Sequence, residues 1–404
     1  MTGTRATDGT LERLAAGAFL LLVAALAGPI APMGITTALA GVLTLACLIW
    51  GSRRPWPRTP VDMAAIGWLA ALLIVSATAL DRAGSFPRVV KGFMPLLVGL
   101  AAWHAADERR GRRALAVYLA AFALVSAIGL VLWVMHGASF TSRARGLAGH
   151  YMTFGGQLLL FIPVALGVAL TSRTPRWRWS AAAVALLALA PLAATFTRSA
   201  WLGLFVSLAV ILAVERPLGL VLLAVAGIAA WFLAPGAWGA RLHSVADPAN
   251  MWNRERVFMW EAGVQMFRDH PLTGVGLQDL HSLYDSYRSP ESVERAGHLH
   301  NAYIQIAASM GLVGLAAFAW LYGSLVRTAW GGLRVGAGRG THAKRGSEGS
   351  ELAAGVRLGV TAALVGFLVA GLFEWNFGDE ELLYHLYTLV GIAWASRGWA
   401  VERL

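Results

Sequence analysis

Long apolar runs dominate the chain, and short charged segments separate them. A helix that crosses a bilayer needs about 20 consecutive apolar residues, because the hydrocarbon core is roughly 30 Å thick. Twelve runs approach that length, so we predict an all-α integral membrane protein of about 12 transmembrane helices. The runs cover residues 11–30, 33–50, 61–80, 88–106, 114–135, 152–171, 179–196, 199–214, 217–235, 302–326, 353–374 and 382–399.

The composition supports a membrane protein. Apolar residues make up 57% of the chain and charged residues 14%, and the mean hydropathy is +0.60, whereas about a quarter of the residues in soluble domains are charged. The formal net charge of +11 suggests nucleic acid at first sight. The arginines lie between apolar runs rather than along one soluble face, so we expect membrane lipids and no nucleic acid as partners.

The basic residues of the short loops predict the orientation, since cytoplasmic loops are rich in Lys and Arg. With the N-terminus in the cytoplasm, the short loops on the opposite side carry only Arg82, Arg88, Arg143, Arg145 and Arg198. The cytoplasmic segments are far richer, so both termini are predicted to be cytoplasmic. Their basic residues are Arg5, Arg13, Arg53, Arg54, Arg58, Arg109, Arg110, Arg112, Arg113, Arg173, Arg176, Arg178, Arg216, Arg327, Arg334, Arg339, Lys344, Arg345, Arg397 and Arg403.

Two long connections divide the chain. Residues 1–235 hold predicted helices 1–9, and residues 302–404 hold predicted helices 10–12. Between them, residues 236–301 form a long, partly helical loop on the non-cytoplasmic side. Its aromatic content favours an ordered functional segment. Residues 327–352 are rich in Gly, Arg and Ser and are typical of a flexible cytoplasmic linker.

Two arginine motifs on the non-cytoplasmic side are candidates for binding an anion. Arg198 lies at the tip of a tight turn between two apolar runs, and Arg254 and Arg256 begin a helix-like stretch. Arginine forks bind phosphate oxygens with two hydrogen bonds, so these residues are candidates for holding a pyrophosphate. The alternatives are an arginine that reaches the lipid headgroups and an amphipathic helix on anionic lipid.

His298 and His300 lie directly before the predicted span 302–326. Histidine accepts a proton near neutral pH and can activate a hydroxyl group. A metal site is the first alternative, but the nearby His281, Asp285 and Glu294 show no recognised ligand spacing, and no metal is expected. The second alternative is two histidines at a helix start without a special role.

An acidic loop, residues 374–381, connects the last two spans. Its carboxylates either pair with the arginines, orient a histidine, or form a solvated turn. Arg82, Arg88 and Lys91 add a further basic set on the same side. The chain has neither the paired carboxylates of a glycoside hydrolase nor an Asp-x-Asp motif. Metal-assisted transfer is therefore disfavoured, and no cofactor is implied.

Taken in order, these motifs resemble the O-antigen ligase and O-antigen polymerase superfamily of bacterial inner-membrane glycosyltransferases. The similar region extends from about Thr195 to Gly314. The motifs that carry the resemblance are Arg198 with Leu202 (R-x3-L), the Arg256 to Trp260 stretch, His270-Pro271-Leu272-Thr273-Gly274-Val275-Gly276, and His300-Asn301-Ala302-Tyr303 with Gly311 (H-x10-G).

The resemblance implies a metal-independent, inverting transfer of a glycan from undecaprenyl pyrophosphate at the periplasmic face. It implies that His300 is the general base and that Arg198 and Arg256 hold the pyrophosphate. Weaker candidates for substrate contact are Arg82, Arg88, Arg254, His298 and Asn301. The glycines of the His270–Gly276 motif are expected to shape the loop through unusual backbone angles.

The acceptor separates two versions of this function. A ligase transfers the glycan to a lipid A-core sugar hydroxyl, whereas a polymerase transfers it to another lipid-linked repeat unit. The long loop and the His-Asn motif resemble those of the ligases, and this resemblance favours the ligase. Alternatives of another class are a lipid-linked glycan transporter and a structural scaffold. An enzyme predicts that His300, Arg198 and Arg256 converge in one cavity beneath the long loop.

Overall fold

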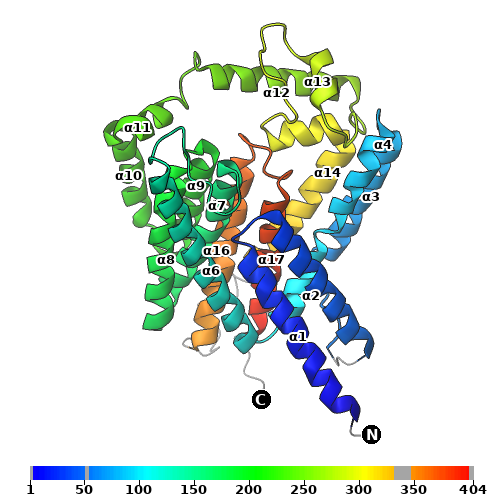
Figure 1. Cartoon of the computed structure of the whole chain (residues 1–404), viewed down its shortest axis with the longest axis vertical. Coiled ribbons are helices and arrows are strands. Elements are labelled where there is room, and N and C mark those ends of the chain that lie inside the picture. The colour runs from blue at the N-terminus through cyan, green and yellow to red at the C-terminus, as the bar shows by residue number, and fades with distance from the viewer. Residues whose placement is uncertain (1–2, 51–53, 332–346, 400–404) are drawn as a thin grey trace.

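The computed structural model describes residues 3–50, 54–331 and 347–399, and this part of the chain is helical without any strand. Long helices run alongside one another between two ends of a bundle (Figure 1). Eight of the helices described are long and apolar enough to cross a membrane. They are α2 (Ile30–Trp50), the segment Arg82–His104, α6 (Glu108–Met135), α7 (Tyr151–Thr171), α8 (Pro175–Ala194), α9 (Arg198–Glu215), α14 (Ala302–Trp330) and α16 (Glu348–Ala370).

The all-helical membrane class is confirmed, but the count of twelve spans is not. The pair α10 (Gly219–Leu233) and α11 (Gly236–His243) is bent by 108° and makes a ninth span if it is counted as one. The other three predicted runs are also helical. However, α3 (Asp62–Thr78) and α17 (Glu380–Ala395) have only 17 and 16 residues, and the first half of α1 (Gly3–Ala25) is charged.

The predicted run 88–106 is a broken helix. Its parts are α4 (Arg82–Ser85), the 3-10 helix η1 (Phe86–Phe93) and α5 (Leu96–His104). Pro87 and Pro95 lie at the two junctions, where a residue without a backbone N–H cannot continue the hydrogen-bond ladder. The break places Arg88 and Lys91 on a short helix of their own.

Small residues let the central helices approach closely. A Cβ atom at Gly167 of α7 would collide with the carbonyl oxygen of Gly355 in α16. Farther along α16, the Ser207 hydroxyl of α9 donates to the carbonyl of Ala362 at 2.9 Å. Contacts between small residues and interhelical hydrogen bonds are the usual means of packing helices in a membrane. They pack α16 closely against both α7 and α9.

Residues 236–301 form a layer across one end of the bundle, here called the α12 end (Figure 1). They contain α11, α12 (Met251–Asp269) and α13 (His281–Tyr287). Met259, Met266, Tyr284 and Leu299 build a small core of their own beneath α12. The buried carboxylate of Glu255 also accepts hydrogen bonds from three consecutive residues, 292–294. The start of α1 lies at the opposite end of the bundle (Figure 1).

The His270–Gly276 motif packs against a break in α14. Gly311 interrupts that helix with a φ of 60°, and the motif bonds to the backbone groups around the break: Leu312 N–H donates to Pro271 O at 2.9 Å, and Val275 N–H to Ala308 O at 2.9 Å. Irregular backbone at membrane depth requires such internal partners. Gly274 and Gly276 have φ of 64° and 111°, the backbone angles that were predicted to shape this loop.

The predicted linker 327–352 is shorter than expected at both ends. Helix α14 continues to Trp330, and α16 already begins at Glu348 because Ser347 caps it by accepting from Ser350 N–H. Residues 332–346 of this linker lie outside the described residues.

Candidate active site

His300 is fixed between two anchored neighbours at the start of α14. It has a φ of 46°, a left-handed conformation that is uncommon for residues other than glycine and often marks a functional site. Leu299 is buried and donates its N–H to Gln305 Oε1 at 2.8 Å. Asn301 caps α14 by accepting from Tyr303 and Ile304 N–H. The imidazole of His300 is therefore presented in one orientation.

Glu374, from the acidic loop after α16, holds one nitrogen of this imidazole. His300 Nδ1 lies 3.0 Å from Glu374 Oε1, and both side chains are largely buried. Burial alone would raise the pKa of Glu374, but the hydrogen bond and charge of His300 and the Arg256 guanidinium outweigh it and lower the pKa to about 2. The carboxylate is thus ionised at neutral pH. A carboxylate at Nδ1 favours the tautomer that leaves Nε2 free to accept a proton.

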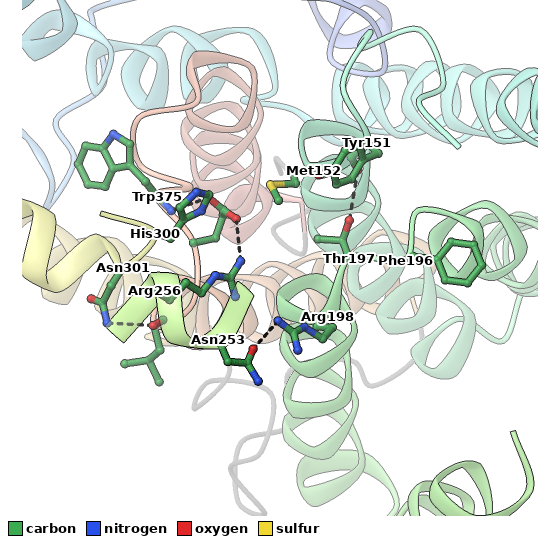
Figure 2. Close-up of polar contacts among 12 residues, drawn as sticks. Tyr151, Met152, Phe196, Thr197, Arg198, Asn253, Arg256, His300, Asn301 and Trp375 are labelled. Carbon is green, nitrogen blue, oxygen red and sulfur yellow. Dashed lines mark hydrogen bonds and ion pairs between the residues drawn. The ribbon is translucent and has the colours of Figure 1, made fainter. Parts of the chain in front are cut away.

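Arg256 connects this pair to a second arginine. Its guanidinium, on α12, lies 3.8 Å from Glu374 Oε2. Arg198, the first residue of α9, donates to the carbonyl of Ser244 at 2.8 Å and to Asn253 Oδ1 at 2.8 Å. Figure 2 shows Arg256 between His300 and Arg198. Segments 198, 253–256, 300 and 374 of the chain thus meet at the α12 end.

The two arginines line one cavity of about 770 Å³, whose wall is otherwise mainly apolar. Its lining includes Trp201, Trp231 and Trp260. His300 does not belong to that lining; its partner Glu374 lines a second cavity of about 230 Å³. The expectation that all three residues share one cavity is therefore wrong. The arginines face one space, and His300 reaches Arg256 only through Glu374.

His298 lies beside His300. Its ring is 4.2 Å from that of His300, edge to face, and it borders the 230 Å³ cavity with Glu374. Burial lowers the pKa of His298, and the neighbouring His300 lowers it further. His298 thus packs against His300 and itself lies at the edge of that cavity.

His298, His300 and Glu374 also form a possible metal-ligand set. One ligand atom from each lies within 4.8 Å of the others. Glu374 was not among the possible ligands considered from the sequence. One of those, Asp285, pairs with Arg288. The fixed positive charge of Arg256 beside Glu374 opposes a divalent cation at this position. The charges therefore fit a proton-accepting imidazole better than a metal centre.

The comparison with known families now bears on these residues. Residues 182–319 match the family model described as O-antigen ligase. The resemblance to that superfamily is confirmed. None of the curated proteins matches the chain. The match supports a membrane glycosyltransferase of the ligase and polymerase family.

The matched segment, residues 182–319, contains most of the candidate residues but not all of them. Arg198, Arg256, His298, His300 and Asn301 lie within it. Glu374, Arg82 and Arg88 lie outside it. The acidic loop thus brings a carboxylate from outside the matched segment to His300 and Arg256.

Several candidates occupy other places. Arg254 is exposed and pairs with Glu291 at 3.2 Å, away from Glu374. Arg82 is exposed on α4. The Asn301 side chain is engaged in capping and in a bond to Leu372 O at 2.9 Å. Arg88 lines a separate cavity of about 420 Å³ together with His298.

Sequence reasoning missed two residues that hold Arg198. Asn253 directly precedes Arg254 in the stretch that was considered for anion binding, but no role was given to it. Ser244 lies at the end of α11 without a motif around it, and no sequence signal marks it. Glu374 was recognised as a possible partner of a histidine or an arginine, and it contacts both.

Proposed function

We propose that this protein is an O-antigen ligase. It transfers a glycan from undecaprenyl pyrophosphate to a sugar hydroxyl of lipid A-core, at the periplasmic face of the bacterial inner membrane. The observation that carries the proposal is the chain of contacts from His300 through Glu374 to Arg256, beside the cavity that Arg256 shares with Arg198.

His300 acts as the general base in this proposal. Its Nε2 accepts the proton of the acceptor hydroxyl while the hydroxyl oxygen attacks the anomeric carbon. Glu374 keeps the proton on Nδ1 and stabilises the imidazolium that forms, a role for which its lowered pKa suits it. A carboxylate that orients an imidazole in this way recurs in enzymes that activate hydroxyl groups.

Arg198 and Arg256 hold the leaving group. The bond between the anomeric carbon and the phosphate oxygen breaks as the new glycosidic bond forms, and undecaprenyl pyrophosphate departs with the electron pair. Two fixed guanidinium groups in a partly dehydrated site stabilise the charge that develops on the pyrophosphate. A single displacement inverts the anomeric configuration, and neither a metal nor a cofactor takes part. The apolar lining of the same cavity suits the lipid part of this donor.

The second candidate, an O-antigen polymerase, uses the same donor and differs only in the acceptor. Transport fits the arrangement less well. A transporter places ionisable groups near the midplane of its spans, whereas His300 directly precedes α14, Glu374 follows the end of α16, and both are joined to Arg256 of α12.

Reconstitution tests the function directly. The purified protein in proteoliposomes receives an undecaprenyl-pyrophosphate-linked glycan together with lipid A-core or with a second lipid-linked repeat. We expect glycan on lipid A-core, and lengthened lipid-linked glycan would instead identify a polymerase.

Two histidine variants make the test specific. His300→Gln is expected to abolish transfer while donor binding persists. His136→Ala, which alters an exposed histidine at the end of α6, serves as the matched control with full activity. Full transfer by the His300→Gln protein would refute the general base.

A further inference from the structure

His298 also lines a cavity that is separate from the arginine cavity and more polar. It has a volume of about 420 Å³, and α3, η1, α14 and α17 enclose it. It shares His298, Trp375 and Gly378 with the 230 Å³ cavity that Glu374 lines. In Figure 2, Trp375 lies on the side of His300 away from Arg198. His298, whose ring packs against that of His300, thus borders this cavity, whereas Arg256 borders the arginine cavity.

The lining of this cavity combines aromatic rings with hydrogen-bonding groups. Trp68, Trp375 and Tyr387 offer flat apolar faces, and Gln278 and Gln305 offer amides. A sugar ring has apolar C–H faces and polar edges, so it fits such a mixed wall. Sites for small ligands have the same build, with aromatic walls and a few polar groups that fix orientation.

Two cations on η1 give the cavity its charge preference. Lys91 is neutralised, because its Nζ lies 2.8 Å from Glu380. Arg88 donates to the Gly84 carbonyl at 2.6 Å and, within the described part of the chain, makes no ion pair. Asp279 also lines the cavity as a carboxylate; it accepts the N–H of His281 at the start of α13 and, within the described residues, forms no ion pair with Arg88. Arg88 is therefore the cation left for an anionic ligand.

We propose that this cavity receives the acceptor sugar, and that Arg88 binds a phosphate or carboxylate group on that sugar. The inference rests on the proposed function and names its acceptor class: an anionic glycolipid. The donor diphosphate then lies on the arginine side of His300, and the acceptor approaches from the η1 side.

Steady-state kinetics with Arg88→Gln tests the inference. We expect the KM for a phosphorylated acceptor to rise about tenfold or more, as for the loss of a charge-assisted hydrogen bond. The KM for the donor and kcat are expected to stay unchanged, and Arg88→Lys should recover part of the loss. Arg268→Gln, at an exposed position of α12, is the control.

Acceptors with and without the anionic group complete the experiment. An acceptor from which the phosphate or carboxylate group has been removed should give wild type and Arg88→Gln the same KM. A lipid-linked repeat as acceptor tells whether the charge lies on a core sugar or in a diphosphate. An equal loss on charged and uncharged acceptors, or a raised donor KM, would overturn the inference. Absence of transfer by the wild-type protein would instead overturn the proposed function, whatever Arg88 does.

Discussion

His300 Nδ1 lies 3.0 Å from Glu374 Oε1, although the two residues are 74 positions apart. His300 directly precedes α14, and Glu374 follows the end of α16. The loop after α16 makes this contact possible, because Ala302 N–H donates to Gly371 O at 2.7 Å and Asn301 Nδ2 to Leu372 O at 2.9 Å. The start of α14 and the end of α16 are thus bonded together, and the imidazole and carboxylate follow.

Replacing Glu374 by Gln is expected to lower kcat roughly ten- to a hundredfold, the usual range for general-base effects. Gln keeps the size of the side chain but removes the charge that stabilises the imidazolium. The acid limb of the pH–rate profile should therefore move to lower pH. The profile is measured for wild type, Glu374→Gln and Glu374→Asp, with Asp expected to retain the wild-type limb. An unmoved limb in the Gln variant would show that Glu374 does not act through His300.

Asn253 is expected to act as a positioning residue for Arg198. It accepts from Arg198 Nη2 at 2.8 Å and donates to Ser244 O at 2.7 Å. Asn253→Ala should raise the donor KM about tenfold with a smaller change in kcat, as expected for a lost hydrogen bond to a charged group.

The double variant separates positioning from direct contact. If Asn253 acts only through Arg198, combining Asn253→Ala with Arg198→Ala should cost no more than Arg198→Ala alone. Fully additive losses in the donor KM would mean that Asn253 contacts the substrate independently. Asn253→Asp, which keeps the acceptor oxygen, should recover much of the activity.

Much of this site was readable from sequence, and its limits have physical causes. Arg198 stands out because a charged group between apolar runs is costly and needs a reason, and His300 stands out as an imidazole directly before a span. The residues alone did not rank Arg254 against Arg256, two helix positions that differ by about 200°; only the resemblance to the superfamily put Arg256 first. Only the docking of α12 decides that Arg256 faces Glu374 and that Arg254 faces Glu291.

The count of twelve spans is not confirmed, for a related reason. Runs of apolar residues mark helices, and a helix lies over each predicted run. Length decides whether a helix crosses a membrane by itself, and sequence alone did not reveal where proline breaks would divide 82–104 or where α10 and α11 would bend. Likewise, apolar periodicity says nothing about which wall a side chain lines. The separation of His300 from the arginine cavity therefore had no sequence signal.

Asp379 is expected to make stability fall as the pH rises from about 4 to 7. Burial raises its pKa to about 7, and Glu381 adds to the shift, although the hydrogen bond from Thr153 opposes it. Its pKa is thus higher in the folded state than the ordinary value of 3.8. The stabilisation is complete below that value and is lost as the pH rises through 7.

Asp379→Asn tests this dependence, because Asn still accepts at the start of α17 but carries no charge. Its Tm in detergent should equal that of the wild type near pH 4 and exceed it by roughly 2 °C or more at pH 8. A constant difference between the two proteins across this range would contradict the assignment. Thr153→Val, which removes the hydroxyl that favours the ionised form, should lower the Tm most at pH 8.

Metal removal is expected to leave transfer unchanged. His298, His300 and Glu374 offer three ligand atoms within 4.8 Å, but Arg256 disfavours a cation beside Glu374. Transfer is measured after dialysis against EDTA and again after addition of Zn²⁺ or Mg²⁺. Activity that disappears with EDTA and returns with Zn²⁺ would replace the general base by a metal centre. Direct metal analysis of the wild-type and His298→Ala proteins gives a readout independent of activity.

The orientation of the bundle gives the last prediction. Cys47 is the single cysteine of the chain and is buried, so Cys47→Ala provides a background for site-specific labelling. The side chains of Arg295 and Arg173 are 74% and 84% exposed. Arg295 belongs to the layer 236–301 and Arg173 to a segment predicted to be cytoplasmic. In spheroplasts, an impermeant maleimide should label the Arg295→Cys protein at once and the Arg173→Cys protein only after permeabilisation. The reverse pattern would place His300 and both arginines in the cytosol, where a glycan that has already crossed the membrane cannot reach them.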